Sequence, residues 1–194
     1  FSSDGQSVAY TSGGASPWWL PQHVFRRSLT GDSEVWLTQS VDRTFWDFRW
    51  VPDSNEIVAM ANDLTRVGLW RFDGDGEALR LDLGDSNVSG FDVDRSGAVA
   101  FVGSQPERPS ELYYMPSTTS AAVRLTNFNA EVASESLGRV EEIVWEGPDG
   151  FAENGVLIYP PEYEAGQTYP LVLLIHGGPM GASTQSFAPS AQLM

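Results

Sequence analysis

Four consecutive residues, His176, Gly177, Gly178 and Pro179, have the types and spacing to take part in acyl-transfer chemistry. They directly follow an apolar run, residues 171–175, whose length and composition predict a buried strand. Glycines at the end of a strand adopt backbone conformations closed to other residues and bring bare N–H groups close to a ligand. Such N–H groups can stabilise a developing oxyanion. The same four residues also suit an ordinary loop, so the rest of the chain has to decide between the two interpretations.

Trp18 and Trp19 are a second candidate site. They lie in a stretch rich in glycine and proline, residues 12–22, which predicts a loop between two strands. Exposed aromatic residues in loops are commoner at binding sites than in structural turns. We therefore expect Trp18 and Trp19 to contact substrate.

Neither a metal site nor a cofactor is predicted. The chain has no cysteine and only two histidines, and His23 has no acidic partner at ligand spacing. Asp73, Asp75 and Glu77 alternate with glycines but lack the 12-residue pattern of a calcium loop, so we interpret them as a hairpin turn. His23 is interpreted as structural.

The elements that must position these residues follow a repeat. Residues 34–38, 78–82 and 122–126 each alternate between apolar and polar side chains, and the three segments are 44 residues apart. A further apolar segment precedes each of them, at residues 23–29, 67–73 and 111–117. A third unit precedes these segments: an aromatic residue, an aspartate three positions later in a turn, and then an apolar strand. The members of this unit are Phe1 with Asp4, Trp50 with Asp53, and Phe91 with Asp94.

Several short antiparallel strands in a period of 44 residues are typical of a β-propeller blade. The repeat therefore predicts about three blades in residues 1–126, too few to close a ring. A single β-sandwich is the alternative, but it would not explain the constant register.

The pattern changes after the third repeat. Residues 127–139 are polar and unpatterned, as expected of a linker. From residue 140 to residue 194 we expect a second domain, with strands at 141–146 and 155–159 before the apolar run. An apolar strand of this kind suits a mostly parallel sheet covered by helices, and residues 187–194 suit the start of such a helix. The predicted fold class is thus mixed: a partial β-propeller followed by the first strands of an α/β domain.

Composition excludes several classes of partner. The chain has 26 acidic and 11 basic residues, all arginine, and a formal net charge of −15. Nucleic acid and anionic membranes would repel such a surface, so we predict neither as a partner. A solvated acidic surface is the favoured interpretation, with adaptation to high salt as the alternative.

The sequence says less about the cellular compartment and the oligomeric state of the protein. No apolar run approaches the roughly 20 residues that span a bilayer. The absence of cysteine favours a cytoplasmic location, although Phe1 already lies inside the repeat and we expect the true N-terminus to be missing. The oligomeric state stays open.

The order of blades, linker, strand, DG turn and GVLIYPPEYEAGQTYPLVLLIHGGP resembles the prolyl oligopeptidase family of serine peptidases, nearest its acylaminoacyl peptidase-like branch. The resemblance implies a propeller that caps an α/β-hydrolase domain and filters what reaches a Ser, Asp and His triad. It also implies that HGGP is a variant of the HGGG-type oxyanion turn. The backbone N–H of Gly178, or of Gly177, would then be an oxyanion donor, and His176 would position the turn.

The nucleophile motif GxSxG is absent, and in this fold the triad follows the HGGP turn. We therefore expect the chain to be a fragment that is inactive alone. The leading hypothesis is a parent serine peptidase that hydrolyses short peptides or acyl-peptides through an acyl-enzyme. The alternatives are a carboxylesterase on the same fold and a non-catalytic propeller that binds proteins or peptides.

Overall fold

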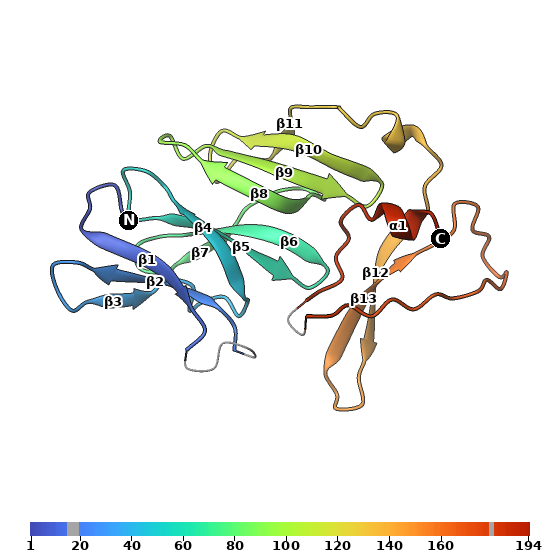
Figure 1. Cartoon of the computed structure of the whole chain (residues 1–194), viewed down its shortest axis with the longest axis horizontal. Helices are drawn as coiled ribbons and strands as arrows, with labels where there is room; N and C mark the ends of the chain where they lie inside the picture. Colours follow the sequence, from blue (N-terminus) through green and yellow to red (C-terminus); the bar gives the residue numbers. More distant parts are fainter. Residues whose placement is uncertain (15–19, 179–180) are drawn as a thin grey trace.

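The computed structural model describes residues 1–14, 20–178 and 181–194, and most of these residues lie in or between β-strands (Figure 1). Three antiparallel sheets follow one another along the chain, as the repeat predicts. The first contains β1 (Ser7–Ser12), β2 (His23–Ser28) and β3 (Glu34–Trp36). The second contains β4 (Phe45–Trp50), β5 (Ile57–Asp63), β6 (Arg66–Phe72) and β7 (Ala78–Arg80). The third contains β8 (Asn87–Val93), β9 (Val99–Gln105), β10 (Arg108–Met115) and β11 (Val123–Arg124).

The three segments spaced by 44 residues are the last strands of the three sheets, β3, β7 and β11. They are shorter than the sequence predicts. The first strands of the second and third sheets, β4 and β8, were not predicted as strands. Both contain a register shift, between Phe45 and Asp47 in β4 and between Val88 and Gly90 in β8. Such bulges interrupt the alternation by which a strand is recognised in a sequence.

The predicted aspartate turns form for the expected reason. The Oδ1 atom of Asp94 accepts hydrogen bonds from the backbone N–H of Ser96, at 2.7 Å, and of Ala98, at 3.0 Å. Asp53 has a φ of 59°, a left-handed conformation that aspartate tolerates better than most residues. A short carboxylate therefore replaces backbone partners in a tight connection between strands.

Packing between the sheets explains the burial of β5. Ile57, Ala59 and Ala61 point to the first sheet, where they pack in one cluster with Val24 and Leu37. The intervening residues of β5 point to the third sheet. Their cluster contains Val58, Met60, Leu69, Phe101, Tyr113 and Met115. The middle sheet is thus covered on both faces, whereas each outer sheet has one covered face.

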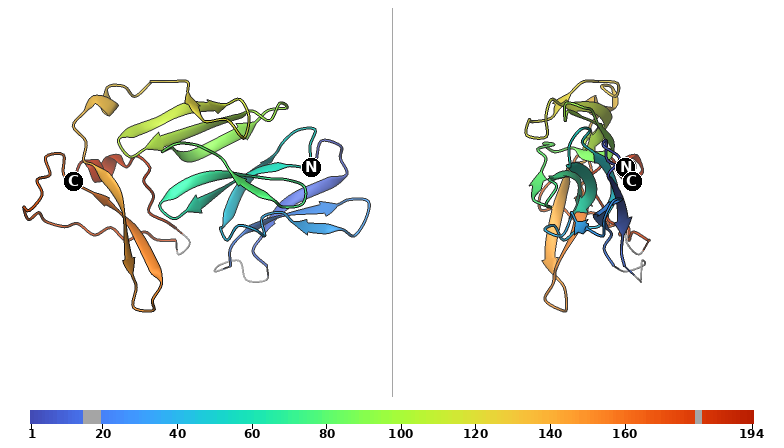
Figure 2. Two further views of the ribbon diagram at one scale, coloured as in Figure 1. Left: turned by 180° about the vertical axis from the view of Figure 1, so that it is seen from behind. Right: turned by 90° about the vertical axis from the view of Figure 1, so that its left-hand side faces the viewer.

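The C-terminal part begins after a short 3₁₀ helix, Val132–Ser134, and lies to one side of the three sheets (Figures 1 and 2). β12 (Val140–Glu146) and β13 (Ala152–Ile158) form the predicted hairpin around a glycine turn. The helix α1 (Pro189–Gln192) lies where a helix was expected.

The expectation of a buried strand at residues 171–175 is wrong for this structure. These residues adopt no strand, and Leu171 and Ile175 are 80% and 83% exposed. An apolar strand is buried when neighbouring strands and covering helices surround it. Among the described residues no segment pairs with residues 171–175.

Glu111 holds the start of the segment that leaves the third sheet. Its carboxylate is 2% exposed and accepts hydrogen bonds from the Thr126 hydroxyl and from the backbone N–H groups of Phe128, at 3.0 Å, and Asn129, at 2.9 Å. Burial raises the pKa of Glu111, but these hydrogen bonds outweigh burial and lower the pKa from 4.5 to about 2. The ionised carboxylate therefore stabilises this connection.

We predict that Glu111→Gln lowers the free energy of unfolding by about 2 kcal/mol at pH 7, because hydrogen bonds to a charged acceptor are lost. The native pKa lies below the ordinary value, so this contribution is complete above about pH 4.5 and is lost as the pH falls towards 2. Urea unfolding of both proteins at pH 7 and pH 3 measures the difference. The matched control is Glu107→Gln, an exposed site on the same hairpin. A loss of equal size at both pH values, or at both sites, would contradict this role.

Candidate functional site

His176, Gly177 and Gly178 lie on the surface, in a turn that follows the apolar run. Gly178 has a φ of 125°, in a region that residues with a side chain rarely adopt. A nitrogen of the His176 ring, Nδ1, lies 3.3 Å from the carbonyl oxygen of Gly177. This contact is local, so the histidine side chain is placed to affect the shape of the turn. Pro179, the fourth residue of the predicted motif, lies outside the described residues.

The backbone donors of the turn are available. Within the described part of the chain, neither the N–H of Gly177 nor that of Gly178 donates a hydrogen bond. An oxyanion site requires such unpartnered donors, held at a fixed place near the reacting carbonyl. In the described part of the chain, the turn by itself offers donors that have no partner. The fixed place of these donors depends on the segments on either side of the turn.

Three tyrosine rings in tilted contact pack together in the segment before the turn. The rings of Tyr159 and Tyr163 have their centroids 4.6 Å apart, and those of Tyr163 and Tyr169 are 5.3 Å apart. The hydroxyl oxygen of Tyr169 also accepts a hydrogen bond from the N–H of Glu164, at 3.0 Å. The loop between β13 and the apolar run is therefore packed on itself up to Tyr169.

The segment after the turn is attached to the propeller, which sequence reasoning did not predict. Gln185 is 6% exposed and hydrogen-bonds to Thr65, in the connection between β5 and β6. Phe187 donates its backbone N–H to the hydroxyl of Ser104, near the end of β9, at 3.2 Å. No pattern in the sequence marks these contacts, because the partners are 120 and 83 residues apart.

Trp18 and Trp19, predicted to contact substrate, lie outside the described residues. The connection that contains them joins β1 to β2 and corresponds in the repeat to the β5–β6 connection, where Thr65 lies. Their role as a substrate contact stays a prediction.

The remaining residues considered for a site have structural roles. The Nδ1 atom of His23 lies 3.3 Å from the hydroxyl oxygen of Thr38, and its ring packs edge-on to Trp36. Burial lowers the pKa of His23, which favours the neutral ring. Asp73 accepts the backbone N–H of Glu77 at 2.9 Å, as in the predicted hairpin turn. In residues 1–14, 20–178 and 181–194, no three His, Asp or Glu side chains are grouped to hold a metal ion.

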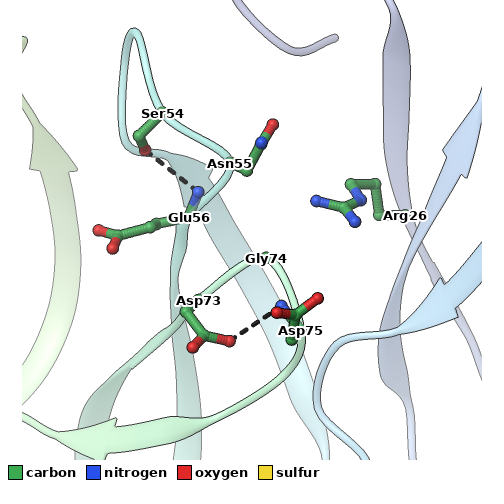
Figure 3. A pocket seen from close by; sticks show the side chains of 7 residues that line it. All are labelled: Arg26, Ser54, Asn55, Glu56, Asp73, Gly74 and Asp75. Atoms are coloured by element: carbon green, nitrogen blue, oxygen red, sulfur yellow. Dashed lines mark hydrogen bonds between the residues drawn. The ribbon is translucent and has the colours of Figure 1, made fainter.

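One surface hollow has a volume of about 380 Å³ and is lined mainly by polar residues. Figure 3 shows Arg26 facing Asn55 and Asp75 across it, with Glu56 and Asp73 along its wall. It lies at the start of β5 and the end of β6, whereas Thr65 and Gln185 meet at the opposite end of these strands. This hollow is therefore separate from the turn at residues 176–178.

The arrangement of sheets, hairpin and turn is found in known proteins. No protein-family model matches the chain. The chain is similar to the uncharacterized peptidase YuxL of Bacillus subtilis, with 32% identity over 133 residues, which are 67% of this chain and 20% of that protein. It is also similar to dipeptidyl-peptidase 5 of Porphyromonas gingivalis, with 24% identity over 199 residues, covering 100% of this chain and 29% of that protein. The solved acylaminoacyl peptidase of Pyrococcus horikoshii superposes with a TM-score of 0.80 at 19% identity, over 100% of this chain and 29% of that one.

These findings confirm the propeller part of the predicted fold class, a partial β-propeller whose sheets do not close into a ring. The start of an α/β-hydrolase domain stays a prediction. The findings also confirm the resemblance of the chain to the prolyl oligopeptidase family of serine peptidases, in the branch that includes acylaminoacyl and dipeptidyl peptidases. The chain spans between a fifth and a third of the length of these relatives. Across the described residues, no helix is long and apolar enough to cross a membrane.

Proposed function

We propose that this chain is part of a serine peptidase that hydrolyses short peptides or acyl-peptides through an acyl-enzyme. The observation that carries the proposal is the match to a dipeptidyl-peptidase over 100% of the chain, from the propeller sheets through the HGGP segment. We assign residues 1–126 to the propeller, 127–139 to a linker and 140–194 to the start of the hydrolase domain. No metal or cofactor takes part in the proposed reaction.

In the proposed reaction the turn stabilises negative charge. A serine outside this chain attacks the scissile carbonyl, and the carbonyl oxygen becomes an oxyanion as the tetrahedral intermediate forms. The N–H of Gly178, or of Gly177, which donates to no atom of the described residues, donates to that oxygen, and the N–H of the residue after the serine is the second donor. One such donor contributes about 3 kcal/mol to transition-state stabilisation. His176 positions the turn through its contact with the carbonyl group of Gly177.

The propeller determines which substrates reach this site. A cap of this kind excludes large folded proteins and admits short peptides, which favours a peptidase over a carboxylesterase. Trp18 and Trp19 belong to a connection that corresponds to the one holding Gln185, so we propose that they contact the peptide as it enters.

A fluorophosphonate probe tests the proposal on the whole protein, because it labels only an activated serine. We expect the whole protein to be labelled and to hydrolyse acyl-peptide p-nitroanilides faster than p-nitrophenyl esters of matched acyl groups, relative to the uncatalysed rates. A chain of residues 1–194 is the negative control. Labelling with turnover of esters alone would identify a carboxylesterase. A folded whole protein that resists labelling would identify a binding module and overturn the proposal.

Gly178→Ala tests the turn itself. A side chain at a φ of 125° strains the backbone and moves the N–H groups from their places. We predict that the rate of fluorophosphonate labelling falls about 10² to 10³-fold, the loss typical of an oxyanion donor. Gly177→Ala is the matched comparison, because a methyl group there meets no described atom within 4 Å and its φ is not positive; a smaller loss is expected. Equal labelling of the wild-type and Gly178→Ala proteins would show that this turn is not the oxyanion site.

A further inference from the structure

The chain after the HGGP turn is fastened to the propeller by a contact of two hydrogen bonds. The backbone N–H of Gln185 donates to the carbonyl oxygen of Thr65 at 2.8 Å, and the Nε2 atom of Gln185 donates to the Thr65 hydroxyl, also at 2.8 Å. Thr65 is 1% exposed and Gln185 is 6% exposed. Because both partners are buried, neither can replace the other with water unless the contact opens. Two bonds to one residue fix the direction of the chain as well as its position.

The following residues continue this attachment. Phe187 bonds to Ser104 of the neighbouring sheet. Gln192, in α1, accepts a hydrogen bond from the N–H of Gly138 at 2.7 Å and donates one to the carbonyl oxygen of Gly138 at 3.1 Å. Residues 185–192 thus contact the second sheet, the third sheet and the segment that precedes β12.

The turn itself has no such attachment. His176, Gly177 and Gly178 are exposed, and in the part of the chain that the structure describes they make no hydrogen bond to the three sheets. The last residue before the turn that packs on another ring is Tyr169, which contacts Tyr163. Among the residues that the structure describes after the turn, the first buried one is Gln185, seven positions beyond Gly178. Among the described residues, Gln185 is therefore the nearest point after the turn at which the chain is attached to the propeller.

We propose that Gln185 is a positioning residue, which with Thr65 forms a latch between the propeller and the oxyanion turn. The latch holds the N–H groups of Gly177 and Gly178 at a fixed place relative to the connections of the propeller through which a peptide enters. The inference rests on the proposed function, because it assigns the latch to the site that would hold the oxyanion. It adds a role for the propeller within the chemical step, besides the selection of substrates by size.

The test compares Thr65→Val and Gln185→Met with the wild-type whole protein. Thr65→Val keeps the shape of the side chain but removes the acceptor of the Nε2 bond, and Gln185→Met removes the donor. Thr65→Ser restores the acceptor, and Gln39→Met makes the same chemical change at an exposed position. We measure kcat and KM on an acyl-peptide p-nitroanilide, the rate of fluorophosphonate labelling, and hydrogen exchange of the peptide that covers residues 171–187.

We expect both latch variants to lower kcat and the labelling rate at least 10-fold with a change in KM below about 2-fold, because misplacement by about 1 Å can cost 10²-fold in rate. Thr65→Ser and Gln39→Met are expected to resemble the wild type. Hydrogen exchange at the backbone N–H groups of Gln185 and Phe187, which are bonded to the propeller, is expected to become faster in the latch variants. Variants with a lower melting temperature but wild-type kcat and labelling would show that Gln185 is only structural, and would overturn the inference.

Failure of the proposed function has a different signature. If the wild-type whole protein is neither labelled nor active, that function is wrong, and hydrogen exchange alone then decides on the latch. Unchanged exchange at Gln185 and Phe187 in the latch variants would show that the side-chain contact with Thr65 does not hold this segment to the propeller.

Discussion

Packing of each sheet against the next is the constraint on which the rest of this structure depends. The second sheet lies between two others, so β5 is buried on both faces, with Ile57 and Ala59 towards the first sheet and Val58 and Met60 towards the third. A sheet in this position cannot rotate or shift without opening an apolar cluster to water. Its connections are therefore held in place, and one of them carries Thr65 into the contact with Gln185. The propeller thus contacts the segment that follows the candidate oxyanion turn.

Much of the fold could be predicted from the sequence because the repeat is local. The alternation within the last strands, the aspartate turns and the glycine turn between β12 and β13 each depend on residues within a few positions of one another, and the alternating segments recur every 44 residues in the three sheets. β4 and β8 could not be predicted in this way, because their bulges break the alternation. The apolar run at 171–175 was predicted to be a strand, but it does not form one. Its composition is that of a strand buried on both faces, as β5 is, but composition states only what a strand requires and not whether its neighbours are present.

The candidate site likewise has one part that the sequence predicts and one part that it does not. The HGGP segment could be recognised because glycines at the end of an apolar run have a local signature, whereas Gln185 is one polar residue among several in STQSF. Its importance comes from Thr65, 120 residues away. Glu111 was missed for a similar reason, since a glutamate in an alternating strand normally predicts an exposed side chain, and here it is buried under the segment that leaves the third sheet. Contacts between parts of the chain that are distant in sequence leave no pattern in a single sequence.

A structure of the whole protein after reaction with a peptidyl phosphonate would test the central claim most directly, because the phosphonyl oxygen occupies the place of the oxyanion. The account predicts that this oxygen lies within about 2.7–3.1 Å of the backbone nitrogen of Gly178 or Gly177, with the Gln185–Thr65 contact intact. A phosphonyl oxygen bound by other donors, with the turn at 176–178 remote from it, would contradict the account.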